Sequence, residues 1–208
     1  MRDRTGVIVA GGRSVRTGGT ETTVADVAGT PLVRRVADRL LGATDRLVVN
    51  CRADQRPAIE EALAGLDPTF AVASEPDRGA LEGISTGLEA ATTEYAAVVA
   101  ADLPLLDPGI VSYLFERAAG REAAVPRPSA WFEPLHAVYE RAPTIEACDR
   151  ALEGSDPRTI DHLSSLDRAV VDRAVLLDHG SLDSFESVDT PADLRWAIER
   201  CRADGDGA

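Results

Sequence analysis

The chain has 208 residues, a formal net charge of −13 and a hydrophobic content of 44%, and all 22 of its basic residues are arginine. That hydrophobic content is enough to bury the core of one domain, which excludes a disordered chain. So acidic a surface repels nucleic acid and anionic membranes, and no apolar run is long enough to cross a bilayer or to start a secretory signal.

We therefore expect a cytoplasmic protein without nucleic-acid or membrane partners. The cysteines, Cys51, Cys148 and Cys201, lie far apart with no CxxC pair, which argues against a disulfide framework or a zinc site. The acidic, lysine-free composition predicts adaptation to a high-salt cytoplasm, where screening weakens self-repulsion. Codon bias toward arginine is the alternative explanation.

The N-terminus reads as a strand that leads into an anion-binding loop. Val7–Ala10 is a β-branched run typical of a buried strand, and residues 11–19 contain four glycines together with Arg13 and Arg16. Backbone amides and guanidinium groups are the donors that a polyphosphate needs. The spacing matches neither the dinucleotide fingerprint nor the P-loop. A flexible glycine-rich connection is the alternative.

Strands and helices alternate through most of the chain. Strands are predicted at 24–27, 46–50, 69–73, 96–101 and 122–126, and helices at 31–41, 57–64, 81–91 and 108–119. This alternation is typical of a parallel α/β sheet, in which ligands bind at the carboxyl ends of the strands. The loop at 11–19, the segment Asn50–Arg52, Asp77 and Asp102 all fall at the carboxyl ends of predicted strands and are expected at that edge.

The second half is less regular. A strand is predicted at 135–139, helices at 144–152 and 159–163, and an edge strand at either 169–171 or 174–177. Thr190 or Asp189 can cap a helix that begins at Pro191 and runs to about Cys201. We expect one Rossmann-like α/β domain over residues 1–202, with a mostly parallel central sheet flanked by helices and a flexible tail at 203–208.

Five segments carry a resemblance that spans nearly the whole chain. They are Val9-Ala10-Gly11-Gly12, the stretch Gly79–Ile84 with Asp77 before it, Ala101-Asp102-Leu103-Pro104, Glu133–Tyr139 and Ser187–Leu194. In this order they resemble the molybdenum cofactor guanylyltransferase (MobA) family. The resemblance implies a GT-A/MobA-like nucleotidyltransferase that uses Mg²⁺ to transfer GMP from GTP to molybdopterin, releasing pyrophosphate. Molybdoenzymes or cofactor-assembly proteins are its implied protein partners.

The resemblance also implies a catalytic set. Asp102 is expected to hold Mg²⁺, which is often bound by one or two carboxylates together with substrate oxygens. Its alternative role is a turn or capping aspartate. Arg13 and Arg16 are expected to cradle the β- and γ-phosphates, and their alternative is a solvated surface pair.

The implied nucleotide-binding residues are Val9, Ala10, Gly11, Gly12, Thr22, Arg52, Asp77 and Asp102. Arg52 aligns with a family asparagine near the nucleoside, a position that Asn50 can also fill. Asp77 has an alternative as a turn residue. Thr22 stands where the family has a lysine, and losing one preorganised charge commonly costs roughly 10²–10³ in rate.

Other functions remain open at this stage. One is a catalytically weakened nucleotide-binding partner in cofactor assembly, and another is guanylyl or cytidylyl transfer to a different phosphorylated acceptor, such as a cobinamide phosphate. A third is a glycosyltransferase-like sheet, which needs a second acidic residue beside Asp102, and residues 101–104 offer none. His136 is interpreted as a packed residue rather than a ligand.

Overall fold

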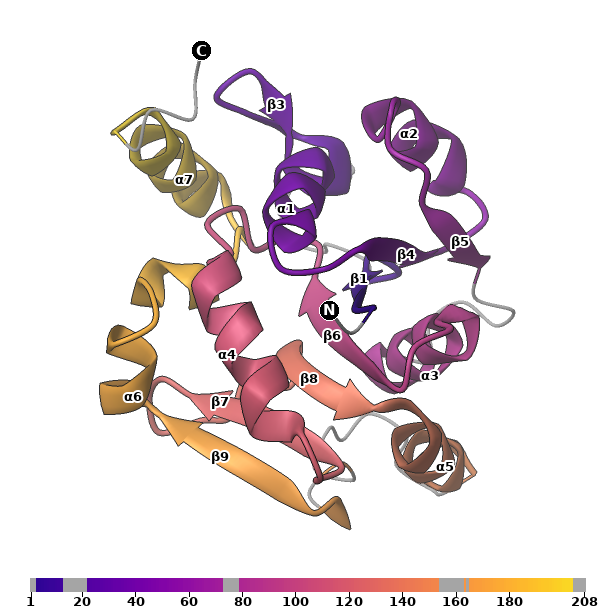
Figure 1. Ribbon diagram of the computed structural model, residues 1–208. Helices are drawn as coiled ribbons and strands as arrows, with labels where there is room; N and C mark the ends of the chain where they lie inside the picture. The colour runs from indigo at the N-terminus through magenta and orange to yellow at the C-terminus, as the bar shows by residue number, and fades with distance from the viewer. Residues whose placement is uncertain (1–2, 13–21, 73–78, 154–162, 164, 204–208) are drawn as a thin grey trace.

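The computed structural model describes residues 3–12, 22–72, 79–153, 163 and 165–203, which form one seven-stranded sheet, a small two-stranded ribbon and the surrounding helices (Figure 1). The strands of the large sheet are β1 (Thr5–Val9), β4 (Arg46–Cys51), β5 (Thr69–Val72), β6 (Tyr95–Ala100), β7 (Ala123–Arg127), β8 (His136–Glu140) and β9 (Arg168–Asp172). The ribbon pairs β2 (Asp26–Val27) with β3 (Thr30–Pro31).

The large sheet is mostly parallel, as predicted. Its strand order is β5-β4-β1-β6-β8-β7-β9, and within it only β8 runs antiparallel to its neighbours. From β1 the chain passes outward to β4 and β5 and then returns to β6 on the other side of β1. The strand order therefore reverses between β1 and β6, and the carboxyl ends of these two strands are where α/β sheets place their ligands.

Two helical layers sandwich the sheet (Figure 1). One layer contains α1 (Leu32–Leu41), α2 (Arg56–Ala62) and α4 (Pro108–Ala118), and the opposite layer contains α3 (Ala80–Ala90) and α5 (Arg141–Leu152). Alternate residues of each buried strand point to opposite faces, so Ile8 packs in the first core and Val7 in the second.

A third, smaller core attaches the C-terminal part of the chain. Buried Val27, Leu32, Leu105 and Val188 pack with the inner face of α7 (Pro191–Ala203). The 3₁₀ turn η3 (Leu182–Phe185) precedes this region, and Ser184 Oγ accepts from the Asp107 amide. Consequently the segment leading into α7 is fixed beside the residues that follow β6.

The predicted elements are found close to their expected positions, with one correction. The strand expected at 24–27 is shorter, because Thr22–Val24 forms the 3₁₀ turn η1 and only Asp26–Val27 pairs. Ala28 (φ 53°) and Gly29 (φ 86°) then reverse the chain tightly.

Of the two edge-strand alternatives, residues 169–171 lie within β9, whereas 174–177 lie within the helix α6 (Arg173–Leu177). The first alternative is favoured because Ala169 and Val171 bury their side chains against the sheet core. The predicted helix at 159–163 falls almost wholly outside the described residues. None of the described helices has the length and apolar character that crossing a membrane requires.

Candidate functional site

The carboxyl ends of β1, β4 and β6 meet at one edge of the sheet. Val9 is in register with Asn50 on one side and Ala100 on the other. Beyond the ladder, the Ala10 amide donates to Asn50 O at 2.8 Å and the Ala101 amide donates to Val9 O at 3.1 Å. This register brings Val9, Ala10, Gly11, Gly12, Arg52 and Asp102 to the same edge, as the sequence predicts, whereas Arg13, Arg16 and Asp77 lie outside the described residues.

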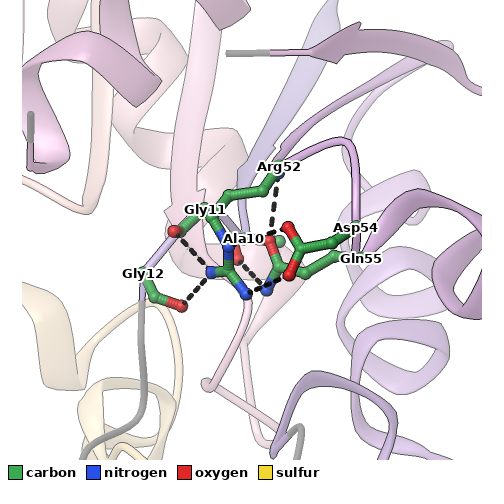
Figure 2. Close-up of polar contacts among 6 residues, drawn as sticks. All are labelled: Ala10, Gly11, Gly12, Arg52, Asp54 and Gln55. Atoms are coloured by element: carbon green, nitrogen blue, oxygen red, sulfur yellow. Dashed lines mark hydrogen bonds and ion pairs between the residues drawn. The ribbon is translucent and has the colours of Figure 1, made fainter. Parts of the chain in front are cut away.

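Arg52 turns its guanidinium toward the glycine segment, which we define as Ala10–Gly12 (Figure 2). Its Nη1 donates to Gly11 O at 2.9 Å and to Gly12 O at 3.0 Å. Its Nε and Nη2 donate to the two carboxylate oxygens of Asp54 at 3.1 and 3.3 Å. The side chain of Arg52 is only 9% exposed, and its observed partners are backbone carbonyls and Asp54. The direct contact with a nucleotide expected for Arg52 stays a prediction.

Gln55, which no sequence pattern singles out, completes these contacts. Its Nε2 donates to Ala10 O at 2.9 Å, and its Oε1 accepts from the Arg52 amide at 3.0 Å. Gln55 is buried at the start of α2. Its position three residues after Arg52 was visible in the sequence, but nothing there indicated that both side chains face the same three carbonyls.

Thr22 lies in η1, which packs against α1 and α2. Thr22 is buried, and its carbonyl accepts from the Ala25 amide. A buried threonine carries no charge, so this position cannot supply the cation that a lysine would bring. The nucleotide contact expected of Thr22 stays a prediction.

Asp102 follows β6 at the same edge, two residues before Pro104. Burial, together with the charge of Asp189, raises the pKa of the Asp102 carboxyl to about 6. The Asp102 carbonyl accepts from the Val188 amide at 2.9 Å, which joins the turn after β6 to the segment leading into α7. Two acidic side chains from distant parts of the chain are thereby brought together.

Asp189 is the acidic neighbour that residues 101–104 did not provide. The helix cap is Thr190, since its Oγ1 accepts from the Asp193 amide at 3.3 Å while Asp193 Oδ2 accepts from the Thr190 amide at 2.7 Å. Asp189 is therefore not required as the cap, and its carboxylate accepts from Ser187 Oγ at 2.8 Å. The sequence suggested this residue only as a capping candidate.

The residues present fit a divalent cation. A largely buried carboxylate with a raised pKa next to a second carboxylate is unfavourable without a positive charge. Within the described part of the chain, no arginine or histidine forms an ion pair with Asp102 or Asp189. Mg²⁺ is commonly held by one or two carboxylates with the remaining positions left to water and substrate oxygens. The described residues contain no cluster of three or more His, Cys, Asp or Glu side chains suited to a metal.

His136 and the cysteines have structural roles. The His136 ring is buried against Phe185, with ring centroids 4.4 Å apart, and burial lowers its pKa to about 3. Its interpretation as a packed residue is confirmed. Cys51, Cys148 and Cys201 are buried free thiols, and burial raises the pKa of Cys51 to about 11 and that of Cys148 to about 12.

A cavity of about 980 Å³ lies at the opposite edge of the sheet, near the amino ends of β1, β4 and β6. Its lining includes Arg4, which stacks on Phe115, and Arg46, which pairs with Asp3. Those cations already have partners. We therefore place the candidate site at the carboxyl edge, where the strand order reverses, and not at this cavity.

Known proteins resemble this chain over most of its length. Residues 6–168 match the family model described as the MobA-like NTP transferase domain. A relative from Natronomonas pharaonis, named probable molybdenum cofactor guanylyltransferase, is 62% identical over 96% of this chain and 99% of its own length. A relative of the same name from Haloferax mediterranei is 40% identical over 95% of this chain and 94% of its own length.

The fold also has solved counterparts. The structure of the molybdopterin-guanine dinucleotide biosynthesis protein A from Archaeoglobus fulgidus superposes with a TM-score of 0.80 at 24% identity, covering 96% of this chain and 99% of the other. At that identity the likeness shows the fold alone.

Proposed function

The chain belongs to the MobA-like NTP transferase family, and from this premise we propose that it transfers GMP from GTP to molybdopterin and releases pyrophosphate. In this reaction an oxygen of the acceptor's terminal phosphate forms a bond to the α-phosphorus of GTP. The bond between that phosphorus and the oxygen bridging it to the β-phosphate breaks, and pyrophosphate leaves. The names of its relatives support this choice of substrates. The cytoplasm, where both substrates are expected, is its proposed location.

The observation that carries the proposal is the place of Asp102, which follows β6 beside the glycine segment and whose carbonyl accepts from the Val188 amide, with Asp189 following Val188 in the chain. Phosphoryl-type transfer needs charge neutralisation and alignment more than covalent chemistry. Asp102 and Asp189 would hold Mg²⁺, which supplies positive charge to the phosphate oxygens when bound. The two groups lie 87 residues apart in the sequence, and the bond from the Val188 amide to the Asp102 carbonyl joins their segments at the edge where the strand order reverses.

The remaining residues bind and orient the nucleotide. The backbone of Val9–Gly12 lines the site, Arg52 and Gln55 contact that backbone, and Asp102 lies across from it. We assign the β- and γ-phosphates to Arg13 and Arg16, and a nucleoside contact to Asp77. Molybdoenzymes or cofactor-assembly proteins are proposed as the partners that receive the product.

Thr22 favours a second candidate function. Because this residue is buried and uncharged, the protein lacks a cation at a position where the resemblance implies a lysine. A nucleotide-binding partner with weakened catalysis would be consistent with that loss. Transfer to another phosphorylated acceptor is the remaining alternative.

The test is a mass-spectrometric search for the dinucleotide product. The purified protein would be incubated with molybdopterin, Mg²⁺ and an equimolar mixture of GTP, CTP and ATP in molar KCl, with the Asp102→Asn variant as the control. Guanine dinucleotide from the parent protein alone supports the proposal. Absence of any product while GTP still binds would favour the non-catalytic partner, and cytosine or adenine dinucleotide would overturn the choice of GTP.

A further inference from the structure

Three successive carbonyls of the glycine segment point toward one turn. Ala10 O accepts from Gln55, and both Gly11 O and Gly12 O accept from the same nitrogen of Arg52 (Figure 2). In an extended strand, successive carbonyls alternate in direction. Their common orientation here shows that the chain has left the extended conformation and is held by the turn between β4 and α2.

The amides of this segment point the other way. The described residues contain no cis peptide bond, and in a trans peptide the N–H is directed opposite to the C=O of the same plane. The Gly11 and Gly12 amides are therefore directed away from Arg52 and Gln55. Among the described residues, neither amide has a protein acceptor. Adjacent outward amides of this kind form an anion-binding concavity.

The glycine segment has open space beside Gly11 and Gly12. A Cβ built on Gly12 would meet no atom within 4 Å, and one built on Gly11 would meet only Asn50 Oδ1, at 3.3 Å. The glycines thus leave the backbone accessible to a ligand, and the carbonyl oxygens, which would repel an anion, are directed away from it.

The charge of Arg52 is largely neutralised within the turn. Two of its nitrogens bond the carboxylate of Asp54, and the side chain is 9% exposed. A guanidinium that is paired, buried and directed at carbonyls is suited to fixing backbone geometry. It is poorly suited to presenting a free charge to a substrate.

We propose that Arg52 and Gln55 form a backbone clamp that orients the Gly11 and Gly12 amides toward the bound nucleotide. Both are positioning residues, acting through the glycine segment. The identity of the ligand rests on the proposed function, whereas the clamp itself does not.

The first measurement is made without nucleotide or metal. Backbone ¹⁵N order parameters of Gly11 and Gly12 would be compared in the parent protein, Arg52→Gln and Gln55→Met. We expect about 0.85 in the parent protein and values below about 0.6 in the variants, because the carbonyls lose their donors. Arg56→Gln is the matched control, since it removes a neighbouring arginine, the first residue of α2, whose described side-chain contacts are an exposed ion pair with Glu60 and the ring of Phe70. This control should leave both glycines rigid.

The second measurement is calorimetric GTP binding in Mg²⁺ and molar KCl. Arg52→Gln should weaken binding by about 10- to 100-fold and Gln55→Met by about threefold to tenfold, from the usual cost of losing buried hydrogen bonds. The double variant should lose less than the product of the two factors, because both act on one segment. Arg52→Lys keeps the charge but cannot bond both carbonyls and Asp54, so it should bind as weakly as Arg52→Gln.

The two measurements test the backbone clamp and the proposed function independently. Unchanged order parameters in both variants would overturn the clamp, whatever happens to GTP. Full GTP affinity in Arg52→Lys together with no effect of Gln55→Met would also overturn it, in favour of a direct charge contact. If the parent protein binds no GTP, the proposed function fails, while the order parameters still decide whether the two side chains hold the segment. Thermal melts of every variant identify any that are unfolded, and Arg52→Lys then replaces Arg52→Gln in the first measurement.

Discussion

The two halves of the candidate site, the β1–β4 side and the β6–α7 side, differ in how their charged groups are paired. On the β1–β4 side, the Arg52 and Gln55 side chains are paired within the protein, since Arg52 is bonded to Asp54 and to two carbonyls, and Gln55 is bonded to a third. On the β6–α7 side, the Val188 amide donates to the Asp102 carbonyl, burial and the charge of Asp189 raise the pKa of Asp102, and no described cation pairs with either carboxylate. In the first half the described guanidinium is already paired, whereas the Gly11 and Gly12 amides and the buried Asn50 Oδ1 have no protein partner among the described residues. In the second half the described residues supply no cation to the two carboxylates.

Because of this difference, the two halves contribute differently to the stability of the fold. A satisfied hydrogen-bond network adds stability and fixes geometry. A buried carboxylate beside a like charge subtracts stability until a cation arrives. Changes in the first half should therefore damage stability and binding together. Changes in the second half should separate them, lowering activity while stabilising the metal-free fold.

The largest expected effect is that of Asp102→Asn. Turnover should fall by about 10³-fold, because a charged metal ligand is replaced by a neutral amide. The metal-free protein should become more stable by up to about 3 kcal/mol at pH 7, which is what a pKa raised from 3.8 to about 6 implies. Product assays and chemical denaturation measure the two effects. Asp67→Asn, on an exposed aspartate, is the control, and equal losses of activity in both variants would contradict the assignment.

The pH dependence of stability comes next and concerns His136, which packs against η3 on the β6–α7 side. Its folded pKa of about 3 lies below its ordinary 6.5, so the unfolded chain binds the proton more readily. The neutral His136 ring therefore contributes its whole share of the free energy of unfolding above about pH 6.5, and this share is lost as the pH falls toward 3. Between pH 7 and pH 4.5 the loss should be about 2–3 kcal/mol.

The check on this value is a comparison of unfolding free energies for the parent protein and His136→Gln across that range. The parent should lose more stability on acidification than the variant, because glutamine does not titrate. Parallel pH profiles for the two proteins would show that His136 is not held neutral by burial.

Gly83→Ala tests the packing beneath the first half. A Cβ at Gly83 of α3 would lie 2.7 Å from Val9 Cγ1 and 2.8 Å from Asn50 Oδ1, so the helix must shift away from β1 and β4. We expect a loss of about 1–3 kcal/mol, typical of overpacking a core, measured by urea unfolding. Glu89→Ala, on the exposed face of the same helix, should have little effect. A stabilised Gly83→Ala protein would mean that α3 is not in close contact with the sheet.

Asp189→Asn should have a smaller effect than Asp102→Asn. Removing one of two negative charges should weaken Mg²⁺ binding by about tenfold, the equivalent of about 1.4 kcal/mol, while an amide oxygen remains as a weaker ligand. Titration of the activity with Mg²⁺ measures the change, and high Mg²⁺ should restore most of the rate. An unchanged Mg²⁺ requirement would remove Asp189 from the cation site.

The smallest expected effect is that of salt on the melting temperature. With a net charge of −13, the folded chain repels itself, and molar KCl shortens the screening length to about 3 Å. The melting temperature should rise with KCl, in keeping with the halophile relatives. NaCl at equal ionic strength should act similarly. A flat melting curve would leave codon bias as the explanation of the lysine-free composition.

The sequence by itself determined the α/β class, most helix and strand positions and the edge at which the site lies. It could do so because hydrophobic periodicity and the residues that follow each strand are local features. The five family segments likewise indicated the nucleotidyltransferase fold, which is confirmed, whereas the role of Asp102 as a metal ligand stays a prediction.

Only the tertiary structure shows which segments of the candidate site lie together. Asp189 approaches Asp102 because Val188 bonds the turn after β6, and Gln55 joins Arg52 because the β4–α2 turn is aligned with β1. Neither pairing follows from local patterns, since each depends on the register of strands distant in sequence. Arg52 illustrates the point, because its position predicted a nucleotide contact, whereas the observed geometry directs its guanidinium to the backbone of the glycine segment.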